Sequence, residues 1–499
     1  MNYPVWEPFI ANSLLIAIIA VVHVFVSHFA IGGGLYLILA ETWARAKNDL
    51  KHLEYVKKLS RFFVLLTVVF GAVTGVGIWV TIGLIHPTGT KWLINNFVWG
   101  WATEWVFFLI EIAAALMYYY GWQRLKPKVH LAIGWIYFIA AWLSLFIING
   151  IVAFMLTPGQ WLASGSFWDG FFNPTFWPSL FFRTFICLTL AGLYAGLVVA
   201  KEKDINLKKR IMRRNGLFAV VGLLFTIPSG WWYYKAIPAA LTGAILPGSI
   251  PATAMEIMII TAVILLILTI LSFLIFPRHS GYVSASILLL FALVSMGGFE
   301  WMRESLRKPF IITDFLYSNH ITTAEAANLP ADNPLPIAFN SDNRGHDLYL
   351  YTCRSCHTID CYNGLAPSIA GLDAEYLSEL MPRLQYFRVA MPPFPGNKPD
   401  GIVLAKFILE QAGPDPLEKN KNLPETEKGQ IVFNRRCGFC HTMNGHSRPL
   451  AESFTDMDSE EASDIIMMIG DLTDQMPPWS GSETELLTLS DYLAGGWQK

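Results

Sequence analysis

The chain has 499 residues, of which 54% are hydrophobic and 15% are charged, and its formal net charge is −2. These values exclude an ordinary soluble domain and indicate a polytopic membrane protein. No basic tract is present, so the composition argues against nucleic acid as a partner. The expected fold class is all-α, because helices satisfy their own backbone hydrogen bonds inside a lipid bilayer.

Eight stretches are long and apolar enough to cross a bilayer, which takes about 20 residues each. The predicted membrane spans are residues 10–41, 60–85, 95–120, 130–157, 178–200, 215–236, 253–276 and 281–303. The loops after the first, third, fifth and seventh spans carry basic residues, whereas the other loops between spans hold a single one, Lys91. By the positive-inside rule the basic loops are cytoplasmic, so both termini are expected outside. No signal-peptide pattern precedes the first span, which is expected to be retained.

Two histidines lie inside the first predicted span, and ionisable groups at membrane depth are functional candidates by default. His23 and His28 each suit either a haem ligand or a hydrogen-bonded contact between helices. Residues 32–34 are three consecutive glycines, which let a flat macrocycle or another helix approach this span closely. The first span is therefore a candidate haem-binding helix.

Two carboxyl groups lie on the third span. Glu104 and Glu111 are seven residues apart, which places them on one face of a helix and about 10 Å apart along its axis. This arrangement suits a proton relay or an acid beside a haem. The alternative is a pair of structural carboxyls that neighbouring hydroxyl groups satisfy.

Charged residues also stand near the outer ends of the fifth and eighth spans. Arg183 lies close to the start of the fifth span, where a haem propionate or Glu304 is the expected partner, and Arg307 is a second candidate for cofactor binding. The eighth span ends in a cluster whose spacings of three and four make its charges neighbours on a helix. The cluster consists of Glu300, Arg303, Glu304, Arg307 and Lys308. A solvated helix end joined by salt bridges is the alternative interpretation.

A proline-containing linker, residues 316–340, connects the predicted membrane domain (residues 1–315) to a polar C-terminal part. That part holds two Cys-x-x-Cys-His motifs, Cys353-Arg-Ser-Cys356-His357 and Cys437-Gly-Phe-Cys440-His441. This pattern attaches c-type haem: both thiols bond to vinyl groups and the histidine ligates the iron. Such attachment takes place outside the cytoplasm, which agrees with the topology that the basic loops predict.

The two motifs belong to an internal duplication. Met391-Pro-Pro and Met476-Pro-Pro follow the two histidines by 34 and 35 residues. Each half, residues 341–413 and 414–499, resembles the small monohaem cytochrome c domains, in which methionine supplies the distal ligand. A zinc ribbon is a poorer interpretation, because each cysteine pair is followed directly by a histidine and later by a methionine. Alternative distal ligands are Met381, Met443, Met467 and Met468.

The first 315 residues resemble subunit I of cytochrome bd-type oxygen reductases. The resemblance runs through residues 23–42, Gly71–Gly75, Glu111, residues 121–130, Asn149-Gly150 and residues 304–310, in chain order. It implies that His23 and Glu304 are axial ligands of two high-spin haems and that Glu111 belongs to the proton-carrying carboxyls. Glu104 is offset by one position from the family's other glutamate. The resemblance also implies a second membrane subunit and one or two non-covalent membrane haems of b or d type.

The departures from this family concern the electron entrance. Arg183 stands where the family has the histidine ligand of its low-spin haem, so this ligand is lost. Only residues 237–252 separate the sixth and seventh spans, so the long quinol-binding loop is missing. Two c domains take the place of the usual ninth helix. The two haem c groups therefore look like a substitute for quinol as the electron entrance.

These features predict a respiratory oxidoreductase of the bacterial inner membrane. A periplasmic cytochrome would deliver electrons to the c haems, and a membrane haem would reduce oxygen with protons drawn through Glu111 or Glu104. Nitric oxide is an alternative acceptor at the same iron. A second alternative is a pure electron-transfer subunit between a quinone pool and periplasmic acceptors, in which His28 ligates a six-coordinate iron. A third is an assembly or docking subunit without membrane haem.

Overall fold

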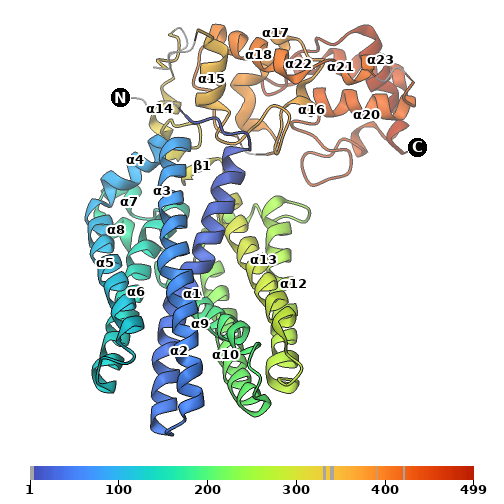
Figure 1. The fold of residues 1–499 in the computed structure, drawn as a ribbon. Coiled ribbons are helices and arrows are strands. Elements are labelled where there is room, and N and C mark those ends of the chain that lie inside the picture. Colours follow the sequence, from blue (N-terminus) through green and yellow to red (C-terminus); the bar gives the residue numbers. More distant parts are fainter. Residues whose placement is uncertain (1–4, 330–332, 338–341, 390, 420–421, 499) are drawn as a thin grey trace. The chain divides into compact units, whose positions relative to one another are not determined.

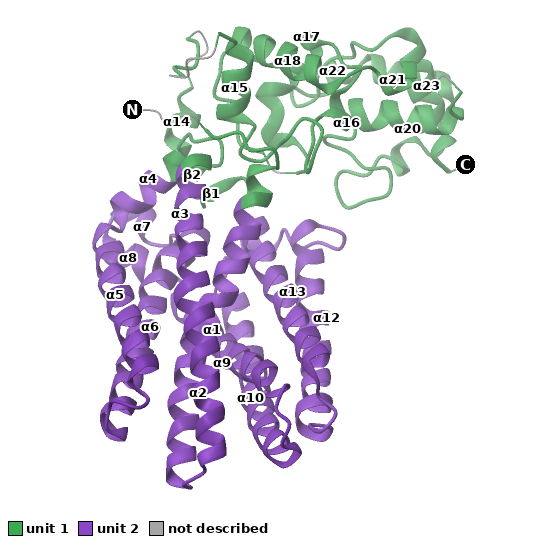
Figure 2. Ribbon diagram, viewed as in Figure 1, with its two compact units in different colours: residues 1–15, 84–89, 308–499 green, residues 16–83, 90–307 purple. Residues whose placement is uncertain are grey.

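The fold comes from a computed structural model that describes residues 5–329, 333–337, 342–389, 391–419 and 422–498. The chain forms two compact units, which Figure 2 shows in different colours. The membrane unit comprises residues 16–83 and 90–307, and the C-terminal unit comprises the described parts of residues 1–15, 84–89 and 308–499. Residues 330–332 and 338–341, which include parts of the predicted linker and the predicted start of the first c domain, lie outside the described residues.

Within the described residues, eight helices are long and apolar enough to cross a membrane, which confirms the predicted number. In chain order they are α1 (Asn12–Ala46), α2–η1–α3 (Leu50–Val64, Leu65–Gly71, Ala72–Ile85), α5 (Val98–Gly121), α6 (Pro127–Leu156), α9 (Phe176–Val199), α10 (Ile205–Ala236), α12–η2 (Ile250–Thr269, Ile270–Ile275) and α13 (Tyr282–Arg307) (Figure 1). The segments η1 and η2 are π-helical. Short helices occupy the loops at the other end: α4 (Pro87–Asn96), α7 (Trp161–Ser164), α8 (Phe167–Phe171) and α11 (Ala239–Thr242).

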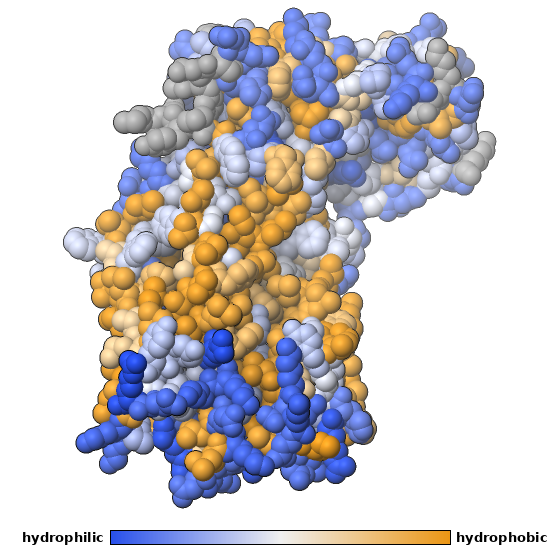
Figure 3. Space-filling model, viewed as in Figure 1, coloured by the Kyte–Doolittle hydropathy of each residue, from blue (hydrophilic) through white to orange (hydrophobic). Residues whose placement is uncertain are grey.

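The surface of the membrane helices matches a bilayer. On the face that Figure 3 shows, hydrophobic side chains cover the middle of these helices, and hydrophilic ones gather at the end where α1 turns into α2 and α9 into α10. That end carries the basic loops. The chain is therefore a membrane protein with an apolar band flanked by charge.

Three predicted spans, the first, the second and the sixth, are too short at their basic ends. Residues 42–59, predicted as a loop, are helical except for a turn at residues 47–49. Asp49 and Asp204 begin α2 and α10 by accepting backbone N–H bonds in the first turn. Hydropathy detects only the apolar part of a helix, whereas these helices continue with polar turns beyond the apolar band.

Close approach of α1 to α9 brings the first and fifth spans together. A Cβ atom added at Gly32 would collide with the backbone carbonyl of Cys187. Only glycine permits this contact, so the glycine run serves helix packing at this point. Arg183 lies one turn before Cys187 on α9 and is therefore near α1.

The C-terminal unit is helical apart from a small antiparallel ribbon that the sequence did not predict, β1 (Phe310–Ile312) and β2 (Leu316–Tyr317). After α14 (Thr323–Ala327), the first c region contains α15 (Arg344–Thr352), α16 (Ala366–Ile369), α17 (Ala374–Leu380), η3 (Met381–Tyr386) and α18 (Lys398–Ala412). The second contains α19 (Pro416–Lys419), α20 (Glu425–Arg436), η4 (Glu452–Phe454), α21 (Ser459–Met467), α22 (Ile469–Leu472), α23 (Glu483–Leu493) and η5 (Gly496–Gln498).

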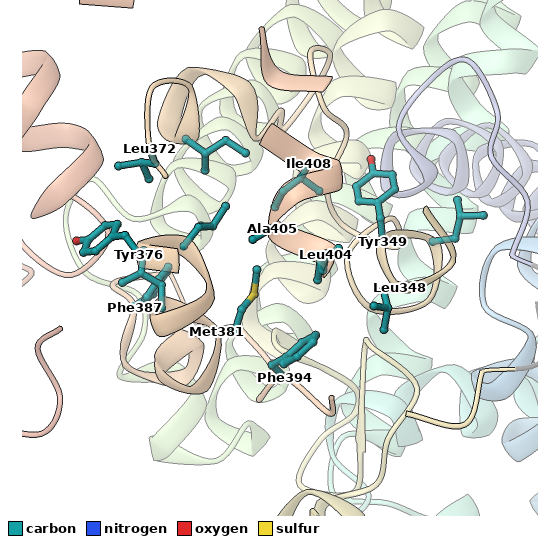
Figure 4. Close-up of a cluster of buried hydrophobic side chains, with 14 residues drawn as sticks. Leu348, Tyr349, Leu372, Tyr376, Met381, Phe387, Phe394, Leu404, Ala405 and Ile408 are labelled. Atoms are coloured by element: carbon teal, nitrogen blue, oxygen red, sulfur yellow. The ribbon is translucent and has the colours of Figure 1, made fainter. Parts of the chain in front are cut away.

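The duplication is visible in how each c region packs. The helix before each motif rests on the closing helix: α15 on α18, and α20 on α23. Glycine permits both contacts, since a Cβ at Gly345 would lie 2.6 Å from the Cβ of Phe407, and one at Gly429 would lie 2.5 Å from that of Tyr492. Figure 4 shows the core of the first region, in which side chains of α15, α17, η3 and α18 meet.

Candidate functional site

Both Cys-x-x-Cys-His motifs have the local geometry of a haem-attachment site. Cys353 ends α15 and Cys437 ends α20, and all four motif cysteines are free thiols. In each motif the histidine ring donates from Nδ1 to a backbone carbonyl: His357 to Asn363 at 3.1 Å, and His441 to Arg448 at 3.0 Å. This bond fixes the ring and leaves Nε2 as the ligand atom.

Burial prepares the same groups for haem. It lowers the pKa of His357 and of His441, which keeps the imidazoles neutral and able to ligate iron. It also raises the pKa of Cys353 to about 11 and that of Cys437 to about 12, so these thiols stay protonated until they are bonded to a vinyl group. The residues present therefore fit covalently bound haem in both motifs.

The predicted distal ligands, Met391 and Met476, are both half-buried. Met391 packs against the core of the first c region. Among the alternatives, Met381 belongs to the centre of that core (Figure 4), whereas Met467 and Met468 are 58% and 51% exposed. The distal ligation stays a prediction.

The first motif is anchored to the N-terminal segment through a residue between its two cysteines. The Arg354 side chain is 4% exposed, and its guanidinium donates to the backbone carbonyls of Pro8 at 2.6 Å and Ile10 at 3.1 Å. Glu7 lies 3.6 Å from the same side chain and bonds His346 of α15 at 3.0 Å. The segment that leads into α1 is thereby bound to the first haem-attachment loop.

The second motif is anchored to the first c region, again through a residue between its cysteines. The ring of Phe439 stacks on Phe387 with centroids 5.0 Å apart, and its carbonyl accepts the backbone N–H of Arg388 at 2.8 Å. Phe439 and Cys440 both pack against the core of the first region. The second attachment loop is thus packed against the first c region.

Inside the membrane unit, the two histidines of α1 face inward. His23 Nδ1 lies 3.1 Å from the hydroxyl of Thr74, just after the π-helical segment η1. His28 is 2% exposed and donates from Nδ1 to the Val24 carbonyl at 2.7 Å, while its Nε2 is buried and has no hydrogen-bond partner among the described residues. A buried imidazole nitrogen with a free lone pair fits a haem ligand.

Arg183 pairs with Glu300 rather than with Glu304, which was one of its two expected partners. The other expected partner, a haem propionate, stays a prediction. The Arg183 guanidinium bonds Glu300 at 2.8 Å, and Arg303 bonds the other carboxylate oxygen at 2.9 Å. Glu300 is one turn deeper on α13 than Glu304, which places it opposite Arg183 on α9. His28 interacts electrostatically with both Arg183 and Glu300. The structure therefore brings these four side chains into one polar cluster inside the bundle.

Glu304 and Arg307, both predicted cofactor contacts, pair with each other at the end of α13. Arg307 is buried and reaches the Met155 sulfur of α6 at 3.8 Å, whereas the Glu304 side chain is 39% exposed. Their roles toward haem stay predictions.

The two carboxyls of α5 face α6. Ser144 donates to Glu104 at 3.0 Å, and Tyr137 donates to Glu111 at 3.0 Å. Both carboxyls lie on one helix face, as their spacing predicts, and each finds a hydroxyl partner, which was the alternative interpretation. The proton-relay interpretation and the structural interpretation are compatible, because a hydroxyl that donates to a carboxyl can also carry a proton.

The sequence interpretation missed two further polar sites. Glu41 and His130 were included only in the segments that carry the family resemblance. In the structure they form a buried pair, with His130 Nδ1 2.9 Å from Glu41 Oε2. Their position inside apolar segments was the available signal. His320 is 4% exposed with both ring nitrogens buried and unbonded, and burial lowers its pKa to about 4. Nothing in its local sequence marked it.

Comparisons with known proteins agree with this architecture. Residues 13–239 match the family described as cytochrome bd terminal oxidase subunit I, and residues 424–493 match the family described as cytochrome C oxidase, cbb3-type, subunit III. A solved structure of bd oxidase from Geobacillus thermodenitrificans is similar, with a TM-score of 0.54 and 16% sequence identity over 60% of this chain and 87% of that chain. At this identity the likeness shows the fold. A comparison with curated protein sequences gives no match.

Proposed function

We propose that this chain, which carries a cytochrome bd oxidase subunit I domain and a cbb3-type cytochrome c domain, is a bd-like terminal oxidase that uses a cytochrome rather than quinol as donor. Electrons would enter through two periplasmic c haems and reach one or two membrane haems of b or d type, where oxygen is reduced. Haem supplies the redox chemistry, and the chain supplies ligands, spacing and protons.

One observation carries the electron path. The second attachment loop packs through Phe439 on the first c region, and the first attachment loop binds through Arg354 to the segment before α1. Helix α1, which starts at Asn12, carries both candidate membrane ligands, His23 and His28. These contacts support a path in which electrons would pass from the second motif to the first motif and then to a membrane haem.

The short connection between α10 and α12 supports a donor other than quinol. Helix α10 ends at Ala236 and α12 begins at Ile250, with only α11 between them. Arg183 supports the same conclusion, because its guanidinium is engaged with Glu300 and has no lone pair for iron. Both features fit a bd-like protein that has lost the quinol-linked haem.

A second candidate function is favoured by His28. Its buried, unbonded Nε2 fits a ligand of a six-coordinate membrane haem that transfers electrons without binding oxygen. The chain would then connect a quinone pool to periplasmic acceptors. Carbon monoxide difference spectra separate the two: a terminal oxidase shows a shifted membrane-haem band, and a six-coordinate relay shows none.

The proposed setting is the bacterial inner membrane with the c domains in the periplasm. A second membrane subunit is proposed from the family. For the periplasmic donor cytochrome, the second c region offers an apolar surface: Met467, Met468 and Leu472 are each more than half exposed. They adjoin the Met476-Pro-Pro segment, since Gly470 of α22 contacts Pro478.

Oxygen uptake by the purified protein tests the proposal. Reduced cytochrome c and a quinol are compared as donors at equal driving force. Uptake that is faster with the cytochrome supports the proposal. Uptake that is faster with quinol overturns the electron entrance, and the absence of uptake with any donor overturns the oxidase activity.

A further inference from the structure

The second c region concentrates negative charge in its last helices. Residues 449–498 contain eleven Asp or Glu and no Lys or Arg, whereas residues 342–413 of the first c region contain eight acidic and six basic residues. The acidic segment includes α21, α22 and α23 (Figure 1). The two copies of the duplication therefore differ in charge: the first is nearly balanced, and this part of the second is strongly acidic.

Most of these carboxylates are available to a partner. Ten of the eleven acidic residues are exposed. The eleventh, Glu485, is paired with Arg435 and Arg436 of α20. Within the part of the chain that the structure describes, none of the ten exposed carboxylates takes part in an ion pair. Their negative field is therefore directed to solvent, where it attracts positively charged molecules.

Exposed apolar side chains interrupt this acidic surface. Met467, Met468 and Leu472 are 58%, 51% and 61% exposed, and all three lie within six residues of the chain. An exposed apolar patch with a polar rim is typical of a site that binds another macromolecule. The patch and the carboxylates around it therefore have the composition of a binding surface.

Helix α21 presents charge and apolar side chains on the same face. It packs on the core of the second c region through Ala462 and Ile466. Glu460, Asp464 and Met467 are exposed and follow one another at spacings of four and three residues. Such spacings place side chains on one face of a helix, so these three lie on the side of α21 that is turned away from the core.

Helix α22 follows directly and lies beside the predicted distal ligand. Its Asp471 and Leu472 are both exposed. A Cβ atom added at Gly470 would lie 3.0 Å from the Cα atom of Pro478, so α22 contacts the Met476-Pro-Pro segment. A protein bound to α22 would therefore lie next to the segment that carries the predicted ligand Met476.

We propose that this acidic face of α21 and α22 docks a small basic electron-transfer protein whose own redox centre lies at a surface ringed by lysines. The acidic face consists of Glu460, Asp464, Met467, Met468, Asp471 and Leu472. The inference rests on the proposed function and deepens it, because it specifies the charge of the donor cytochrome. Opposite charges steer the two proteins together and orient them. The apolar patch is small, as is typical of the short-lived complexes that transfer electrons.

Zinc-substituted cytochrome c, a basic protein with zinc in place of iron, is the probe for docking. It is mixed anaerobically with the full-length, haem-loaded, oxidised protein. The light-excited zinc porphyrin passes one electron to a ferric c haem, and the electron then returns, so no net reaction remains. The second-order rate constant for quenching of the excited state measures productive docking. A second probe is the same zinc protein with its lysines succinylated, which makes it acidic.

Two variants with the same change in net charge are compared. The test variant removes three carboxylates of the acidic face: Glu460→Gln, Asp464→Asn and Asp471→Asn. The control variant removes three exposed carboxylates outside α21 and α22: Asp342→Asn, Glu410→Gln and Glu418→Gln.

We expect the test variant to lower the quenching rate constant of the basic probe about tenfold at low ionic strength and to raise that of the succinylated probe. Both differences should vanish at 1 M salt, where the Debye length is about 3 Å. Damage to the fold does not produce opposite changes with the two probes. Rate constants that fall for both probes or stay unchanged, or an equal response of the control variant, overturn the acidic face as the docking site.

The measurement involves no oxygen, so it separates this inference from the oxidase activity. A protein that takes up no oxygen but shows the opposite changes with the two probes keeps the docking surface and loses the proposed function. A protein that takes up oxygen without these changes keeps the oxidase activity and loses the docking surface.

Discussion

The two c regions share a motif but use different positions of it to make their contacts. In the first motif Arg354, directly after the first cysteine, reaches out to the N-terminal segment, and Ser355 follows it. In the second motif the corresponding residues are Gly438 and Phe439, and it is Phe439 that packs on the first region. The same motif therefore contacts the N-terminal segment in one copy and the neighbouring c region in the other.

This difference predicts different places for the two copies in the proposed electron path. The first region contacts both the N-terminal segment and the second motif, so the proposed electron path would run through it. The second region contacts the first at several points, among them Phe439 on Phe387 and the Arg436 guanidinium over the Tyr376 ring, and it presents exposed Met467 and Met468. The comparison predicts an inner relay and an outer acceptor, and each of the following experiments disturbs one copy at a time.

The largest effect is expected from removing one haem. Cys353→Ala with Cys356→Ala, or Cys437→Ala with Cys440→Ala, should each halve the c haem content measured as pyridine haemochrome. Loss of the second haem should abolish oxygen uptake with reduced cytochrome c but spare uptake driven by ascorbate and a small mediator, which can reach the inner haem. Loss of the first haem should abolish both. If the protein without the first haem still turns over with the mediator, the proposed order is wrong.

Arg354→Leu should uncouple the first region from the N-terminal segment. The buried Pro8 and Ile10 carbonyls lose a charged donor, which we expect to cost about 3 kcal/mol of that contact. Oxidation of the c haems by the membrane haem, followed by stopped-flow absorbance, should slow by about tenfold or more. The exposed Lys406→Ala in the same region is the control. Equal rates in the two variants contradict a role for this contact in electron transfer.

Phe439→Ser gives the second motif the residue of the first at that position. The stacking on Phe387 is lost, and for this half-buried ring we expect about 2 kcal/mol less stability of the interface. Transfer between the two c haems should slow while the haem content stays at wild-type level. The measurement is rapid-mixing spectroscopy of the reduction of the two c haems. If the two haems are reduced in Phe439→Ser at the wild-type rates, the packing of Phe439 plays no part in electron transfer.

Local patterns predicted the number of spans, both attachment motifs and the shared face of Glu104 and Glu111. Each depends on residues near in sequence, or on a periodicity of one helix. Glu304 was the wrong glutamate for Arg183 because Glu300 lies one helical turn away, and only the packing of α9 on α13 selects Glu300. The Glu41–His130 pair and the anchoring role of Arg354 join segments 89 and about 340 residues apart. No local rule specifies such contacts.

The smallest effect concerns acid stability and separates the segment before the first c region from the second c region. His320 lies in the predicted linker, where Ser318 contacts Cys356 and Asn319 donates to the Pro393 carbonyl. Its pKa falls from 6.5 to about 4 because the ring is buried, so the unfolded chain binds a proton below pH 6.5 that the folded chain rejects. Stability is therefore complete above pH 6.5 and decreases toward pH 4, by about 1.4 kcal/mol at pH 5.5. Denaturant unfolding followed by haem circular dichroism should show this loss, and His320→Asn should reduce it. The exposed His446→Asn in the second region should leave the pH profile unchanged, and an equal response of both variants would contradict the assignment.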